Sequence, residues 1–119
     1  MTAPDRDHAS RAGIRAVRAD ARVVAARLPD GGQATMVLSD TRDEGVATVT
    51  GLRALPGGRT YQLWLMSGGV ARSVGVLDVG QDRDTVLVHG ARRAGQFGIS
   101  TEPAGGSRTP SNVWASMDL

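Results

Sequence analysis

The fold is decided by the stretch Thr60-Tyr61-Gln62-Leu63-Trp64-Leu65-Met66, in which strand-favouring residues follow one another without a break. Its second half, residues 63–66, is apolar at four consecutive positions. Side chains of a strand point alternately to its two faces, so both faces of this segment would be buried. We therefore place it as a central strand of a sheet, covered on both sides.

Working outward from this strand, the chain shows short apolar runs separated by clusters of Gly, Asp and Pro. Further strand candidates are residues 33–39, 45–50, 73–79, 85–89, 96–101 and 112–117. Many short strands spaced by about 8–12 residues, with turn signals between them, are typical of all-β folds. The pattern predicts an all-β, antiparallel β-sandwich of the immunoglobulin-like type, with about 7–8 strands.

The glycines support this prediction. They occur in pairs where turns are expected, because glycine accepts a positive φ without steric cost. These pairs are Gly31-Gly32, Gly57-Gly58, Gly68-Gly69 and Gly105-Gly106. Gly75 and Gly98 instead stand alone inside strand candidates, which indicates a bulge or close packing beneath an aromatic ring.

The segment before residue 29 has two interpretations. Ile14, Val17, Ala21, Val24 and Leu28 fall at helical spacing, so a helix over residues 11–28 is one of them. The other is a strand over residues 21–28 that turns at Pro29-Asp30-Gly31-Gly32, where Pro sets φ for the turn and Gly accepts a positive φ. We favour the hairpin.

Two motifs carry a family resemblance. They are residues 61–65, Tyr-Gln-Leu-Trp-Leu, and residues 102–107, Glu-Pro-Ala-Gly-Gly-Ser, with a small-residue step at 71–77 between them and Thr109-Pro110-Ser111 after them. In this order and at this separation they resemble the extracytoplasmic C-terminal domain of the transmembrane anti-sigma-K factors, the RskA-type family. The resemblance covers roughly residues 20–119. Val74, Thr101 and Ser111 are mild departures from the family pattern.

The resemblance implies a regulatory module and not an enzyme. In relatives, an inner domain inhibits an extracytoplasmic-function sigma factor, and the outer domain controls the access of a site-one-type protease to the juxtamembrane segment. Intramembrane cleavage then frees the sigma factor. The resemblance thus implies two partners, that protease and an extracytoplasmic sensor protein, and a place on the extracytoplasmic side of the cell membrane.

We expect this chain to be the outer part of such a protein. Residues 1–19 are expected to form a flexible juxtamembrane-type tail and residues 20–119 the β-sandwich. Contact with the sigma factor would then require a cytoplasmic domain, and contact with the membrane a transmembrane helix, that this sequence does not contain. The proposed role of the sandwich is to shield or expose the segment around residues 7–20.

The motif residues invite a structural and a partner-facing interpretation, of which we favour the first. They are Tyr61, Gln62, Leu63, Trp64, Leu65, Gly75, Glu102, Pro103, Gly105, Gly106, Ser107 and Pro110. In the structural interpretation, Pro103 holds Glu102 extended, the glycine pair turns the chain and Ser107 bonds nearby backbone. In the other, Glu102 is an exposed charge that contacts a partner.

The four aromatic side chains test an alternative function. Tyr61, Trp64, Phe97 and Trp114 all lie inside strand candidates with apolar neighbours, so we expect them to pack in the core. A free-standing binding or adhesion module for a cell-surface glycan or protein would instead leave Trp114 or Tyr61 at least half exposed.

Composition bounds the remaining chemistry. There is no cysteine, and the two histidines, His8 and His89, have no ligand-like spacing, so we predict no metal site, no cofactor and no catalytic residues. All 14 basic residues are Arg, spread among 12 acidic ones, and aromatics make up only 3%, which argues against nucleic-acid binding. A lesser possibility is that Arg92-Arg93 contact anionic lipid, with Arg11, Arg15 and Arg18.

Overall fold

The structure, a computed structural model, describes residues 21–119. This part of the chain forms eight strands and one short 3₁₀ helix. The strands are β1 (Arg22–Arg27), β2 (Gln33–Ser39), β3 (Glu44–Thr50), β4 (Arg59–Ser67), β5 (Val70–Val76), β6 (Asp84–His89), β7 (Gln96–Pro103) and β8 (Val113–Asp118), with η1 (Ala91–Arg93) between β6 and β7.

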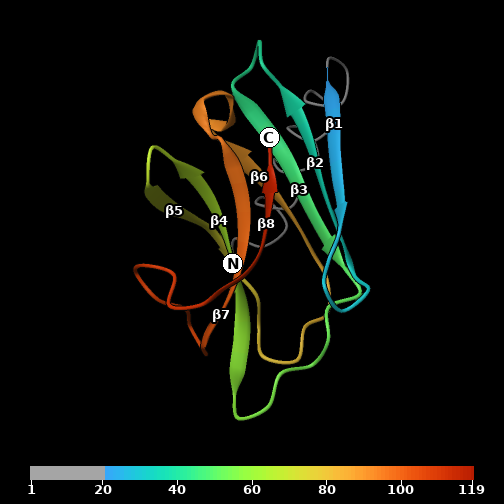
Figure 1. The fold of residues 1–119 in the computed structure, drawn as a ribbon, viewed down its shortest axis with the longest axis vertical. Helices are drawn as coiled ribbons and strands as arrows, with labels where there is room; N and C mark the ends of the chain where they lie inside the picture. Colours follow the sequence, from blue (N-terminus) through green and yellow to red (C-terminus); the bar gives the residue numbers. More distant parts are fainter. Residues whose placement is uncertain (1–20) are drawn as a thin grey trace, which may run out of the picture.

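The strands form two four-stranded antiparallel sheets (Figure 1). The first sheet has the order β1-β2-β3-β6 and the second the order β5-β4-β7-β8. The prediction of an all-β antiparallel sandwich is confirmed, and so is the inner position of the strand around Trp64. That strand, β4, pairs with β5 on one side and with β7 on the other.

The hairpin interpretation of residues 21–32 is confirmed over the described residues, and the helix is wrong there. β1 pairs with β2 in a regular antiparallel register. The Leu28 N–H donates to the Gly32 carbonyl at 2.7 Å, which closes the turn. Gly31 has the positive φ expected of it, at 93°. Gly32 does not, and it is required for another reason: a Cβ there would lie 2.6 Å from the Thr50 carbonyl oxygen. The expected tail, residues 1–19, lies outside the described residues.

One predicted strand is displaced. Residues 73–79 were expected to be extended, but β5 covers Val70–Val76. Gly68 and Gly69 both have positive φ, 57° and 82°, and so make a two-residue turn that lets the returning strand begin at once. Gly75 lies beside a β-bulge opposite Leu63 and Trp64, as expected of a lone glycine in a strand.

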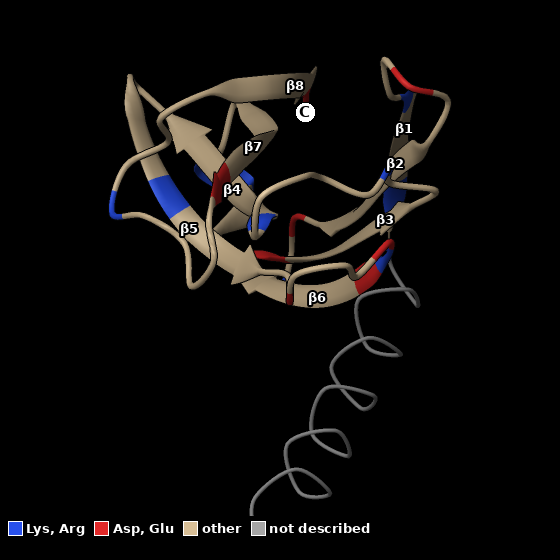
Figure 2. Ribbon diagram, turned by 90° about the horizontal axis from the view of Figure 1, so that it is seen from below, with Lys and Arg blue, Asp and Glu red and all other residues tan. Residues whose placement is uncertain are grey.

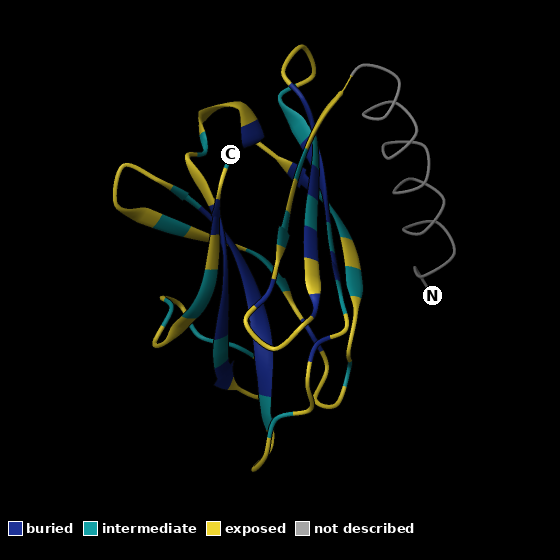
Figure 3. Cartoon of the chain, turned by 45° about the vertical axis from the view of Figure 1, so that its right-hand side comes forward, coloured by how far each residue is buried: buried dark blue, intermediate teal, exposed yellow. Residues whose placement is uncertain are grey.

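The core lies between the sheets and is built by alternation. Every second residue of the inner strands points inward, among them Met36, Val49, Leu63 and Ile99, all at most 1% exposed. Figure 3 shows that buried residues dominate the inner strands, whereas the outer ones are largely exposed. Between residues 21 and 119 no helix has the length and apolar character needed to cross a membrane.

The two long sides of the sandwich differ. Viewed along the strands in Figure 2, the edges β5 and β6 lie side by side, whereas β1 and β8 stand apart. On the closed side, the Arg72 guanidinium of β5 donates to the His89 carbonyl of β6. On the other side a cleft remains, to which we return below.

Candidate functional site

The pairing of β4 with β7 sorts the motif residues onto the two faces of the second sheet. On the inner face, Leu63 lies opposite Ile99 and Leu65 opposite Phe97. On the outer face, Gln62 lies opposite Ser100 and Thr60 opposite Glu102. Both faces are buried, because the loop of residues 104–112, here called the strap, folds back over the outer one.

Gln62 fixes the middle of the strap to the sheet. Its side-chain Nε2 donates to the Ser107 carbonyl at 3.0 Å, and its Oε1 accepts from the Ser107 N–H at 2.8 Å. Nε2 also donates to the Ser73 hydroxyl on β5 at 2.8 Å. One buried amide therefore binds the strap and the neighbouring strand together, with no polar atom left unpaired.

Glu102 holds the middle of the strap and its C-terminal end. Its carboxylate accepts from the Ser107 hydroxyl at 2.7 Å and from the Ser111 hydroxyl at 2.6 Å, and also from the Ser111 N–H at 2.9 Å. The Ser100 hydroxyl completes the set. Glu102 is 0% exposed. Burial by itself would raise the pKa of this carboxyl, but the hydrogen bonds from Ser111, Ser100 and Ser107 outweigh burial and lower the pKa to about 2.

Trp64 extends this network into the sheet. Its indole Nε1 donates to the Ser100 hydroxyl at 2.8 Å, and the ring is 0% exposed. Gly98 lies opposite it on β7, where a Cβ would come within 2.5 Å of the Met66 Cε. Close packing is therefore present at Gly98, but the nearest side chain is that of Met66 and not the aromatic ring that was expected. We call Gln62, Trp64, Ser100, Glu102, Ser107 and Ser111 the clasp.

Gly106 lets the strap approach the sheet. Its φ is +84°, and a Cβ would lie 2.8 Å from the Gln62 Oε1 and 2.9 Å from the Val76 Cγ2. Gly105 also has a positive φ, +87°, but faces open space. The two glycines of one motif thus answer different requirements, close approach for Gly106 and backbone conformation alone for Gly105.

The structure therefore places the motif residues in three groups. Tyr61, Leu63 and Leu65 belong to the inner core, and Gln62, Trp64, Glu102, Gly106 and Ser107 to the outer face. Gly75 lies at the bulge, Pro103 ends β7 and is exposed, and Gly105 and Pro110 lie in the strap.

The partner-facing interpretation is wrong for Glu102, which is not an exposed charge, because the strap closes over it and supplies its partners. One detail of the favoured structural interpretation is wrong as well. The Ser107 hydroxyl does not bond nearby backbone either: it donates to Glu102, while the backbone of Ser107 bonds Gln62.

Sequence reasoning missed Ser100 and the role of Ser111. The alternation of side chains along a strand could have identified Ser100, because a residue two positions before Glu102 lies on the same face of the sheet. Ser111 was treated as a departure from a usual Thr. Its hydroxyl is a ligand of Glu102, and a threonine hydroxyl has the same donor.

The aromatic rings lie in the protein interior, as predicted. Tyr61, Trp64 and Phe97 are at most 3% exposed, and Trp114 is half-buried against the core. The Tyr61 and Trp114 ring centroids lie 5.5 Å apart at an interplanar angle of 51°. Burial, and then the nearby Asp30 charge, raise the pKa of the Tyr61 phenol. A ring at least half exposed, as expected of a glycan-binding module, is found at neither Tyr61 nor Trp114, because most of the Trp114 surface is also covered.

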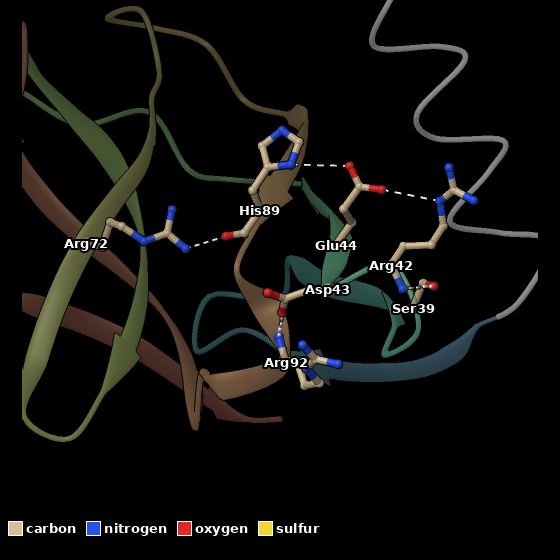
Figure 4. A network of polar contacts seen from close by, with 7 residues as sticks. All are labelled: Ser39, Arg42, Asp43, Glu44, Arg72, His89 and Arg92. Atoms are coloured by element: carbon tan, nitrogen blue, oxygen red, sulfur yellow. Dashed lines mark hydrogen bonds and ion pairs between the residues drawn. The ribbon is translucent and has the colours of Figure 1, made fainter.

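A second polar cluster joins the ends of β3 and β6 to η1 (Figure 4). Glu44 pairs with His89 (Oε2 to Nδ1, 3.2 Å) and with Arg42 (Oε1 to Nε, 3.4 Å). Asp43, at φ +53°, accepts from the Arg92 N–H at 2.7 Å. The backbone of Arg92 is thus held in this loop, and its guanidinium donates to the Asp40 carbonyl at 3.4 Å while the residue stays exposed. Contact of Arg92 and Arg93 with lipid stays a prediction, and Arg11, Arg15 and Arg18 lie outside the described residues.

The clasp does not have the form of a reaction centre. The oxygens of Glu102 are already bonded by three serines, so the clasp offers no free base or nucleophile. Among residues 21–119 no three His, Cys, Asp or Glu side chains gather in a way that could hold a metal ion. What the clasp does is bind the strap to the sheet.

Fold and clasp together define a two-sheet all-β domain whose own loop closes one outer face. The family model described as anti-sigma-K factor rskA, C-terminal, matches residues 2–117. The chain belongs to this family.

Individual relatives agree with this assignment. The chain is similar to anti-sigma-K factor RskA of Mycolicibacterium vanbaalenii, with 33% identity over 84% of this chain and 43% of the relative. It is 30% identical to anti-sigma-K factor RskA of a Mycobacterium species (strain KMS), over 78% of this chain and 39% of the relative. An uncharacterized protein in the phr 5′ region of Streptomyces griseus is 36% identical over 78% of this chain and 40% of the relative. The chain thus spans about two-fifths of the length of these relatives. No solved structure matches it.

Proposed function

We propose that this chain is the extracytoplasmic regulatory domain of a single-pass membrane anti-sigma factor, and that it is not catalytic. Its role would be to control how fast a site-one-type protease cuts the segment before β1. Family membership is the observation that carries this proposal. Sigma-factor binding would belong to the part of the protein that the relatives have in addition to the region shared with this chain.

The clasp suggests how such control would work. The two sequence motifs of the resemblance meet in it, and they contribute to folding, not to an exposed surface. A domain of this kind acts by being folded or not folded, and a loss of a few kcal/mol changes the unfolded fraction by orders of magnitude. We propose that the unfolded fraction, or binding of an extracytoplasmic sensor protein to the folded sandwich, sets the cleavage rate.

The test uses the whole anti-sigma factor in its own cells, with a reporter for the cognate sigma factor. Trp64→Ala removes the ring that joins sheet and clasp, and we expect it to raise reporter activity and the amount of cleaved fragment. Deleting the site-one-type protease should abolish both increases.

The matched control is Glu44→Gln, which changes the only other glutamate of the chain, at the surface cluster. It should leave reporter and fragment at wild-type levels. The proposal fails if Trp64→Ala unfolds the purified domain and yet leaves fragment and reporter unchanged in cells.

A further inference from the structure

The open side of the sandwich holds a cleft between the edges β1 and β8. It has a volume of about 250 Å³. Its walls come from both sheets, with Ala26 and Leu28 on one side and Ile99, Ala115 and Met117 on the other. The only charged residue of the lining is Arg27, so the cleft is an apolar slot with one cation at its rim.

The edge of β1 beside this cleft has free hydrogen-bonding groups. The Leu28 N–H donates to Gly32, and hydrogen-bonded pairs alternate along an antiparallel ladder, so the even-numbered residues of β1 bond β2. The N–H and C=O groups of Val23, Ala25 and Arg27 therefore point away from the sheet. Among the described residues they have no backbone partner.

β1 lacks two of the features by which edge strands are usually protected: its register with β2 has no bulge, and it contains no proline. Its charges stand only at its two ends, Arg22 and Arg27, and Arg22 pairs with Asp40. Between them, the side chains that it turns inward, Val24 and Ala26, are uncharged. Ala25, in the middle of the edge, is small and exposed, so a second backbone can approach it.

The geometry points to strand addition: β1 accepts an extended segment of another protein as a further strand of the first sheet. The added backbone would pair with Val23, Ala25 and Arg27, and every second side chain would enter the cleft. The ligand is therefore an extended peptide with small apolar residues at alternate positions and a carboxylate near Arg27.

A second copy of this chain fits this site less well. A second copy would bring its own second sheet, which lies behind the inward side chains of its β1, up to the same cleft. A single extended segment has no second sheet to accommodate, so it can pair with β1 and place every second side chain in the cleft. The inference stands apart from the proposed regulatory function, because its test measures only peptide binding by the purified chain.

The probe is an acetylated and amidated heptapeptide that alternates valine with threonine and carries a glutamate at each end. Titrated into the isotope-labelled chain, it should shift amide NMR signals of β1 and of the cleft residues. Ala25→Pro removes only an outward N–H, which an edge strand tolerates, and should weaken binding by about tenfold or more. Ala25→Thr keeps the N–H and is the matched control.

A second variant is independent of the β1 backbone. Ala115→Leu fills the cleft from β8 and should weaken the same titration, whereas a probe with a central proline should not bind. Three results would overturn the inference: no shifts at millimolar probe, shifts away from β1 and the cleft, or equal affinity of Ala25→Pro and wild type. A dimer in sedimentation that Ala25→Pro dissociates would also overturn it, by assigning this edge to a second copy.

Discussion

The inner and outer faces of the two inner strands of the second sheet, β4 and β7, are both buried, but by different means. On the inner face, apolar side chains such as Leu63 and Phe97 meet those of the other sheet, and any residue of similar shape satisfies the contact. On the outer face, Gln62, Glu102 and the serines satisfy one another through directed hydrogen bonds. The comparison shows that one face of a sheet can be covered by apolar packing and the other by hydrogen bonds. Apolar packing requires side chains of the right size, whereas the hydrogen bonds require particular residue types.

The largest effect on stability should come from Trp64, which lies on the outer face of the sheet and is nevertheless fully buried. Trp64→Ala should lower the free energy of unfolding by about 3–5 kcal/mol, because it opens a cavity and leaves the Ser100 hydroxyl without a donor. Trp114→Ala, at a half-buried ring, should cost clearly less. Urea denaturation followed by circular dichroism measures both, and equal losses would contradict the distinction.

Substitutions of the two strap glycines distinguish the cost of a steric clash from the cost of backbone strain. Gly105→Ala should cost about 1–2 kcal/mol, the penalty of a left-handed conformation in open space. Gly106→Ala has the same penalty and in addition displaces Gln62, so we expect a further loss of about 1–3 kcal/mol. Thermal unfolding of the two variants side by side measures the difference. If they melted together, the strap would not be held as closely as described.

Glu102 tests whether the outer face depends on charge. Glu102→Gln keeps the shape but removes the carboxylate that several donors share, and it should cost about 2–3 kcal/mol. Glu44→Gln should cost under about 0.5 kcal/mol, because its partners lie at the surface. Chemical denaturation measures both losses of unfolding free energy. Similar losses would mean that the buried hydrogen bonds of Glu102 stabilise the fold no more than the surface contacts of Glu44 do.

The same comparison should also depend on pH. The pKa of Glu102 is lowered from 4.5 to about 2 in the folded protein, so between these values the unfolded chain binds the extra proton. The stabilisation is therefore complete above about pH 5 and is lost as the pH falls toward 2. The difference between wild type and Glu102→Gln should shrink over this window. A constant difference from pH 7 to pH 2.5 would show that this carboxylate is not the titrating group.

Sequence periodicity was sufficient for the inner face but not for the outer one. The unbroken apolar run around Leu63-Trp64-Leu65 predicted a central strand buried on both faces, and the glycine pairs predicted the turns, because an apolar run and a positive φ are local properties. The clasp is not local: Gln62 and Ser107 are 45 positions apart. Nothing in the composition of residues 102–111 says that this loop folds back over β4, so Glu102 allowed an exposed interpretation. The start of β5 was misplaced for a different reason. Arg72 and Ser73 interrupt the apolar pattern, so the sequence does not show that the strand begins directly after the glycine turn.

Gln62 has a further consequence, because its side chain imitates a peptide group. By donating to the Ser107 carbonyl and accepting from the Ser107 N–H, it pairs with the strap as one residue of a ninth strand would. The Ser107 amide hydrogen is thereby protected from solvent by a side chain and not by a ladder. Its hydrogen-exchange rate reports local opening of the strap alone, whereas amides of β4 and β7 exchange through global opening. That single amide would show whether a ligand, a mutation or a drop in pH releases the strap before the sandwich unfolds.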